Sequence, residues 1–375
     1  MSTYHFIEPL DLLFLRGNKL FGAAGSYGES QVPPWPSVAA GAVRSSILLH
    51  DKVDLKAFSK GKVTHHELGT PTNPGSFRVT DFRLARRTDG NIEAFYPMPV
   101  DLVVSEKESG EVTVSRLTPS KAPEGVSSSF SLAKLPLLVE PERCKPSSSY
   151  WVKEAGWWCY LEGKVPQADE LIKTDALWKM QERTGIALDG QRGAVKEGHL
   201  FTVQGVAFAE HVGFLLATSG VKVSSSHLRF GGDGRGAELT AEVDFASPLP
   251  DYKKMLRDKR CRVVLTSPGL FEHGWRLPGM AEDGAFELRG VKGTVCSAAL
   301  SRSEVVSGWD LAKGCPKTAL RSAGIGSVYW LENLEATPEA LAGLLQQGLW
   351  DEKVDLARQA EGFNRFQFAI YEGKK

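Results

Sequence analysis

Apolar and polar positions divide the first part of the chain into strands, loops and one helix. Residues 4–16 are apolar with β-favouring side chains and predict a first strand, followed by a glycine-rich loop over 17–31. Residues 32–50 begin with prolines, offer Ser37 as an N-cap and then place apolar side chains at helical spacing, which predicts a helix. Residues 78–104 predict strands around a TDGN turn.

The middle of the chain mixes weak and strong patterns. The segments RLTPSKAPEGVSSSF and VEPERCKPSSS are rich in Ser and Pro, and they predict a surface insertion at about residues 105–150. Residues 168–185 predict a helix that ends at Gly185. Residues 185–210 predict two β segments joined by a turn that bears Gly and Arg, which is typical of a projecting hairpin. Residues 211–220 predict a further strand.

A second set of elements follows a proline-bearing segment at 239–250. We therefore expect two domains, over residues 1–240 and 241–375. The later strands are expected within 260–271, 293–311, 324–333 and 363–373. A helix over 337–350 should be capped by Thr337, with Pro338 at its first position. Strands interleaved with a few helices predict an α+β protein.

Composition narrows the function classes. The 375 residues exceed what one hydrophobic core usually holds. Lys plus Arg and Asp plus Glu both number 45, so a nucleic-acid contact must come from a local basic surface. The five cysteines form no C-x-x-C pair, which indicates reduced thiols, no zinc ribbon and a cytoplasmic location. No apolar run approaches the roughly 20 residues that span a bilayer, so no membrane is expected.

The stretch SSSHLRFGGDGRGAEL, from Ser224 to Leu239, is the most distinctive local motif. Asp233 could be a metal-binding acid of a palm-type nucleotidyl enzyme, but such two-metal sites need a second carboxylate. Asp11 is the only obvious donor. The motif matches neither a P-loop nor a dinucleotide fingerprint. A turn that glycine permits is the simpler interpretation, and the metal-dependent enzyme stays as an alternative.

The histidines favour no catalytic assignment. His65 and His66 are adjacent and are expected in a solvated loop, without the spacing of a metal site. His199 and His227 could each contact RNA or act as a general base, although neither has a nearby nucleophile. We therefore assign no catalytic residue, no metal and no cofactor.

Basic residues recur beside glycines at the edges of the predicted strands. Single-stranded RNA is bound in this way, with guanidinium groups and backbone N–H groups on its phosphates. Ordinary surface arginines explain the pattern about equally well, and this alternative stays open. The candidate RNA-binding residues on this ground are Arg16, Lys19, Arg44, Arg183, Arg192, Arg229, Arg235 and Arg365, and His199 in the predicted hairpin is a further candidate.

Four short motifs in a fixed order carry a family resemblance. They are P-P-x-P-S-x-x-A-G-A-x-R at 33–44, R-x-G-I-x-L through G-x-L-F at 183–201, G-G-x-G-R at 231–235 and G-S-V-Y at 326–329. In this order the chain resembles the RAMP subunit of type III-B CRISPR effector (Cmr) complexes that holds the 5′ tag of the crRNA.

The resemblance implies two tandem ferredoxin-like (RRM-like) modules with a thumb-like hairpin at about 183–203 and no nuclease or cyclase activity. It implies a role in antiviral defence, with the crRNA 5′ tag, a large polymerase-like subunit and a backbone RAMP subunit as partners and target RNA contacted indirectly. Gly231 and Gly232 would then lie at an RNA or subunit interface. A CRISPR repeat endonuclease of related fold, with His199 or His227 as its base, stays as a second alternative. The C-terminal glycine-rich loop of RAMP proteins is reduced here to EGFNRF, where Phe363 and Arg365 would supply stacking and charge.

Overall fold

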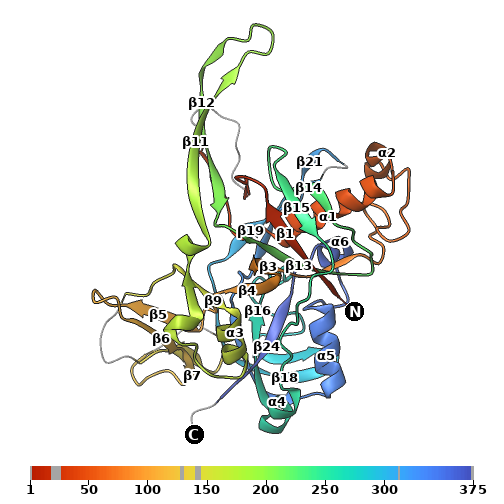
Figure 1. Ribbon diagram of the computed structural model, residues 1–375. Helices are drawn as coiled ribbons and strands as arrows, with labels where there is room; N and C mark the ends of the chain where they lie inside the picture. The colour runs from red at the N-terminus through yellow and green to blue at the C-terminus, as the bar shows by residue number, and fades with distance from the viewer. Residues whose placement is uncertain (1, 18–26, 127–130, 140–144, 311–312, 373–375) are drawn as a thin grey trace.

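Two antiparallel sheets dominate the α+β fold (Figure 1). The computed structural model describes residues 2–17, 27–126, 131–139, 145–310 and 313–372. Lys19, one of the candidate RNA-binding residues, lies outside the described residues. In the part of the chain that is described, no helix has the length and apolar character needed to cross a membrane.

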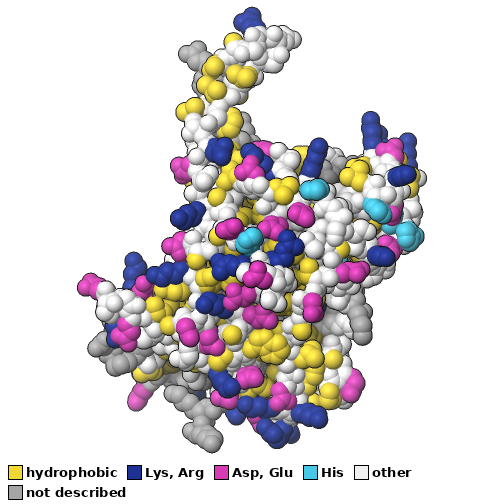
Figure 2. Space-filling model, in the orientation of Figure 1, with side chains coloured by type: hydrophobic (Ala, Val, Ile, Leu, Met, Phe, Trp, Pro, Cys, Tyr) yellow, Lys and Arg dark blue, Asp and Glu magenta, His cyan; other side chains and the backbone are white. Residues whose placement is uncertain are grey.

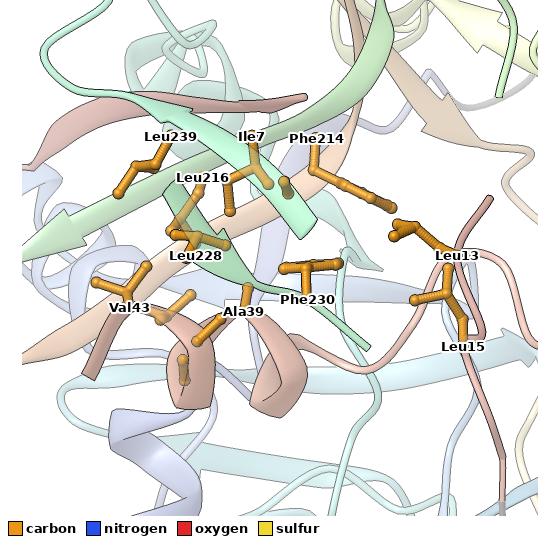
Figure 3. Packing of buried hydrophobic residues seen from close by; sticks show 14 of the residues in the cluster. Ile7, Leu13, Leu15, Ala39, Val43, Phe214, Leu216, Leu228, Phe230 and Leu239 are labelled. Carbon is orange, nitrogen blue, oxygen red and sulfur yellow. The ribbon is translucent and has the colours of Figure 1, made fainter. Parts of the chain in front are cut away.

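The first sheet has eight strands in the order β10-β9-β4-β3-β13-β1-β15-β14, and each neighbouring pair is antiparallel. Helix α1, Pro36–His50, packs on one face of it. Ile7 and Leu216 from the sheet meet Ala39 and Val43 from α1 (Figure 3). The strands are β1 Thr3–Pro9, β3 Arg78–Thr88, β4 Asn91–Pro97, β9 Tyr150–Lys153, β10 Leu171–Lys173, β13 Val212–Ser219, β14 Ser226–Arg229 and β15 Gly236–Thr240.

Helix α1 begins two residues earlier than expected. Trp35 is its N-cap, with extended backbone and no side-chain cap hydrogen bond, and Pro36 is the first helical residue. The prediction that Ser37 caps the helix is therefore wrong. The fixed φ of proline suits the first helical position, where an N–H group has no intrahelical partner.

The second sheet has five strands in the order β17-β18-β23-β16-β24. Helices α4, Tyr252–Asp258, and α5, Pro338–Gln347, pack on one face of it around Leu341 and Val263. The Thr337 hydroxyl accepts a hydrogen bond from the Ala340 N–H at 3.2 Å, so the predicted cap is confirmed. The strands are β16 Arg260–Leu265, β17 Ala285–Leu288, β18 Val291–Ala299, β23 Val328–Glu335 and β24 Phe366–Ile370.

The remaining faces of the two sheets pack against each other. Phe6 and Tyr96 from the first sheet share a buried cluster with Val264, Trp330 and Ala369 from the second. Side chains alternate along a strand, so neighbours such as Phe6 and its successor on β1 point to opposite faces. The molecule is therefore layered as helix, sheet, sheet and helices.

A buried ion pair joins the layers. Arg262 on β16 donates to Asp101 at 2.6 Å, and Asp101 also accepts the Tyr160 hydroxyl at 2.7 Å. All three are at most 1 % exposed. Burial by itself would lower the pKa of Arg262, but Tyr160 and Asp101 raise it above the ordinary value. Arg262 therefore stays charged between the two sheets.

A long hairpin projects from the first sheet (Figure 1). It consists of β11, Trp178–Leu188, and β12, Val195–Phe208, and β2, Tyr27–Gly28, pairs with β12 in parallel. The prediction of a helix over 168–185 is therefore wrong, because this segment contains a 3₁₀ turn, β10, a second 3₁₀ turn and the start of β11. Strand pairing with β9 and β12 overrides the helical preference of its charged residues.

The smaller elements frame these layers. Part of the predicted surface insertion at about 105–150 is regular, because β5–β6 and β7–β8 are paired strands and Lys134 donates its backbone N–H to Cys296 at 2.9 Å. The elements not yet given are β5 Leu102–Glu106, β6 Val112–Arg116, β7 Thr118–Ser120, β8 Leu135–Leu137, α3 Glu154–Leu161, α2 Leu55–Ser59, β19 Glu304–Val306, β20 Trp309–Asp310, β21 Cys315–Pro316, β22 Leu320–Ser322, α6 Leu356–Ala360 and the 3₁₀ turns Ala168–Glu170 and Thr174–Ala176.

Candidate nucleic-acid interface

The chain leaves β1 as a strap, residues 11–16, that runs between the hairpin and the glycine-rich turn. The observed strand is shorter than the predicted one over 4–16, because β1 ends at Pro9. In the strap, the Asp11 carboxylate accepts the Leu12 N–H at 2.6 Å. Leu13 exchanges two backbone hydrogen bonds with Val206 of β12, at 3.0 and 2.8 Å. The strap is therefore fixed to the base of the hairpin.

The glycine turn, residues 230–235, connects β14 to β15 and touches the strap. Phe230 donates its N–H to the Arg235 carbonyl at 2.8 Å, and Gly232 donates to the Phe14 carbonyl at 2.7 Å. Gly231 has φ of +80°, and a Cβ there would lie 2.7 Å from the Phe14 carbonyl oxygen. Glycine is required here because the strap approaches so closely.

Two ion pairs cross between the strap and the glycine turn. Arg16 lies 3.5 Å from Asp233, and Arg235 lies 2.9 Å from Asp11. The Arg235 guanidinium also lies 5.0 Å from the centre of the Phe14 ring. Both arginine side chains keep about a third of their surface in solvent, 36 % and 30 %. The pairs join the two segments while both arginine side chains stay partly exposed.

Arg229 adds a third cation beside this turn. It is exposed on β14 and pairs with Gly236 of β15, directly after Arg235. Arg229 and Arg235 flank the same turn, and Arg16 reaches it from a distant part of the sequence through its pair with Asp233. We call these three the arginine cluster.

The geometry gives the metal-dependent alternative no support. Asp233 and Asp11 each face an arginine across the strap and the glycine turn. Among the residues that the structure describes, no three His, Cys, Asp or Glu side chains lie where they could hold a metal ion. Two carboxylates that already pair with guanidinium groups are poorly placed to share metal ions.

The candidate residues of the hairpin lie apart from the arginine cluster and from one another. Arg183 is exposed in the middle of β11, whereas Arg192 is exposed in the turn at the tip, where its N–H donates to Asp189 at 3.0 Å. His199 is half-buried on β12. A strand of this length extends roughly 35 Å, so the tip lies far from the glycine turn.

Arg44 points into the molecule. Its guanidinium lies 5.1 Å from the centre of the Phe77 ring, and its Nε atom has no hydrogen-bond partner among the described residues. Burial lowers the pKa of Arg44, which Glu361 partly offsets. An arginine in this position supports the packing of α1, so we leave it out of the arginine cluster.

The EGFNRF segment is also used internally. Phe363 is 0 % exposed and packs with Trp35, so it presents no ring face to a base. Arg365 donates to the carbonyls of Gln346 and Leu345 at 2.8 and 2.9 Å, where α5 ends. Burial lowers the pKa of Arg365 to about 10. The expected stacking and charge on RNA do not fit this geometry, because both side chains stabilise the fold instead.

Sequence reasoning missed the partners that organise the site. Phe14 supplies both the carbonyl that Gly232 binds and the ring beneath Arg235. Asp11 was considered as a metal ligand, whereas it pairs with Arg235. The signal in the sequence was the charge pattern. The strap and the glycine turn each carry one Asp and one Arg, which suits two ion pairs between them.

Comparison with known proteins places this chain in a family. The model of the Cas_Cmr3 family, described as a CRISPR-associated protein, matches residues 5–364. Two solved structures are similar over 97 % of this chain. One is a type III-B Cmr-beta complex bound to cognate target RNA, with 15 % identity, 96 % of that chain covered and a TM-score of 0.49. The other is a type III-B Cmr-beta complex bound to cognate target RNA and AMPPnP, with 17 % identity, 95 % of that chain covered and a TM-score of 0.48. No curated protein matches. The match over nearly the whole length shows that the chain belongs to the Cas_Cmr3 family of CRISPR-associated proteins.

Proposed function

We propose that this protein is the subunit of a type III-B Cmr effector complex that holds the 5′ tag of the crRNA, and that it binds RNA without catalysing a reaction. The observation that carries the proposal is the arginine cluster at the glycine turn, in a chain of the Cas_Cmr3 family. Guanidinium groups form charge-assisted hydrogen bonds to phosphate, often two at a time. Three such groups around one turn suit the backbone of a single strand.

The wider role follows from the family resemblance. We propose that the protein docks the large polymerase-like subunit and the first backbone RAMP subunit, contacts target RNA indirectly and acts in antiviral defence in the cytoplasm. We also propose that the chain forms two ferredoxin-like modules, over residues 1–240 and 241–375, and that the β11–β12 hairpin is the thumb. The two sheets and the projecting hairpin are compatible with that arrangement.

The test measures binding of RNA that carries the crRNA 5′ tag, beside a scrambled RNA of the same length. Arg229→Ala and Arg235→Ala should each weaken binding by about 1–2 kcal/mol, roughly 5- to 30-fold, as expected for loss of a charge-assisted hydrogen bond. Arg257→Ala removes an exposed arginine on α4 and serves as the matched control, because its side chain is 73 % exposed and lies outside the site.

Asp233→Asn should leave affinity equal or slightly higher, because it removes a negative charge that pairs with Arg16. If both arginine variants bind tag RNA as the parent does while circular dichroism is unchanged, the proposed RNA path is wrong. If the parent binds tag and scrambled RNA equally, the assignment to the tag is wrong even though the surface binds RNA.

A further inference from the structure

A basic knob, residues 50–66, follows the C-terminal end of α1 and includes the short helix α2. It projects from the body of the molecule (Figure 1), and Figure 2 shows Lys or Arg and His side chains gathered over it. Its exposed lysines are Lys52, Lys56, Lys60 and Lys62. The side chain of His66 is 76 % exposed beside them.

The two carboxylates of the knob are used within it. Asp54 caps α2, because its carboxylate accepts the N–H groups of Lys56 and Ala57 at 2.8 and 3.2 Å. Asp51 lies 2.8 Å from Nε2 of His65. The two carboxylates therefore accept hydrogen bonds from the backbone of α2 and from a buried histidine ring, whereas the lysine side chains are exposed to solvent.

His65 closes the base of the knob, and the prediction that it lies in a solvated loop is wrong. It is 5 % exposed, and its Nδ1 atom accepts the N–H groups of Glu67 and Leu68 at 3.2 and 3.1 Å. An Nδ1 atom that accepts two hydrogen bonds leaves the ring hydrogen on Nε2, which donates to Asp51. This buried contact gives the knob a defined shape.

The four lysines make no ion pair with any residue that the structure describes. Elsewhere, exposed lysines such as Lys107 and Lys173 do pair with carboxylates, at 2.9 and 2.8 Å. Within 50–66 the four lysines face two acids, so the knob has a net charge of +2 with neutral histidines, although the chain as a whole is neutral. Positive charge is concentrated here rather than balanced.

The chemistry of these side chains identifies the partner. Lysine is depleted at protein–protein interfaces, where arginine and aromatic residues are favoured. A flexible ammonium group acts as a point charge, which suits phosphate oxygens and does not read base edges. A polyphosphate backbone therefore fits the knob better than a protein surface does.

The knob also continues the surface of the proposed tag site. Strand β14 contacts α1 through Ser226 and Ser46, whose hydroxyl groups are 2.8 Å apart. His227 and Arg229 are exposed along β14 between that contact and the glycine turn. On these grounds, and resting on the proposed RNA-binding function, we propose that the basic knob is a second RNA surface that binds the sugar–phosphate backbone without base recognition.

The experiment compares the parent with Lys56→Glu/Lys60→Glu, using a uridine oligonucleotide and separate crRNA and target-strand probes. At roughly 0.7 per phosphate contact for a single strand, loss of two contacts should lower the slope of log affinity against log salt by about 1.4. Affinity for the uridine oligonucleotide should fall at least 10-fold at low salt. The matched control is Lys253→Glu/Arg257→Glu on α4, with the same change in charge at exposed positions.

An unchanged slope, or an equal loss in the α4 control, would overturn the proposal. Retained RNA binding with loss of co-purification of the large polymerase-like subunit would identify a protein surface instead and would also overturn it. The crRNA and target-strand probes show which RNA contacts the knob. A knob variant that still prefers tag RNA over scrambled RNA leaves the proposed function intact, so the two proposals can fail separately.

Discussion

At the scale of single residues, His5 makes the stability of the protein depend on pH. The ring is 1 % exposed, and Nε2 lies 2.8 Å from the Thr218 hydroxyl. Burial lowers the pKa of His5 from 6.5 to about 4. Below pH 6.5 the unfolded chain takes up a proton that the folded protein does not, so stability falls as the pH falls from 6.5 towards 4.

The expected loss at this residue is roughly 2 kcal/mol by pH 5, from about 1.4 kcal/mol per pH unit. Urea unfolding at pH 7.5 and pH 5.0 measures it. His5→Gln keeps an N–H donor without titrating, and this variant should lose about 2 kcal/mol less than the parent over the same interval. Equal losses would show that other groups cause the acid sensitivity.

At the scale of elements, the hairpin positions the strap. A Cβ on Gly205 of β12 would lie 2.4 Å from a methyl carbon of Leu12. Gly205→Val should therefore displace the strap and with it the Asp11–Arg235 pair. Although no basic residue is changed, the affinity for tag RNA should fall about 5-fold, which corresponds to a loss of about 1 kcal/mol of binding free energy.

The matched control is Gly343→Val on α5, where a Cβ meets no atom within 4 Å. Filter binding or fluorescence anisotropy measures the affinity of both variants. If Gly205→Val binds as tightly as the parent, the strap does not position the RNA-binding arginines.

Elements with strong local signals could be predicted, and those that depend on distant partners could not. Thr337 and Pro338 identify α5 because capping is a local property. The segment 168–185 was misread because β9 and β12, which hold it extended, are remote or follow it in the chain. In the candidate site Arg229 and Arg235 were predicted, but the inward orientation of Arg44 and Arg365 depends on tertiary neighbours such as Phe77.

At the scale of the whole molecule, the Arg262–Asp101 pair links the second sheet to the segment that follows β4 of the first sheet. Removing Arg262 leaves the buried Asp101 carboxylate with only the more distant Nε of Arg116, at 3.8 Å. Breaking a buried pair in this way costs about 3–5 kcal/mol. We expect Arg262→Met to lose that much stability, because Asp101 is 0 % exposed. The double variant Asp101→Asn/Arg262→Met should recover about half of the stability that Arg262→Met loses, because the amide oxygen can still accept a hydrogen bond from the Tyr160 hydroxyl.

Urea unfolding of the single and double variants, arranged as a double-mutant cycle, measures this coupling. Losses that simply add would mean that the pair contributes nothing as a pair.

The crossed ion pairs of the strap and the glycine turn have a consequence for ligand choice. Asp11 and Asp233 occupy the arginines when no RNA is present, and the backbone keeps each carboxylate next to its partner at high effective concentration. An isolated phosphate or mononucleotide must displace the tethered carboxylate without the help of such a tether. An RNA strand brings consecutive phosphates on one chain and so gains the same advantage. If the arginine cluster binds RNA as proposed, we expect it to prefer a long polyanion over the small phosphates of the cell.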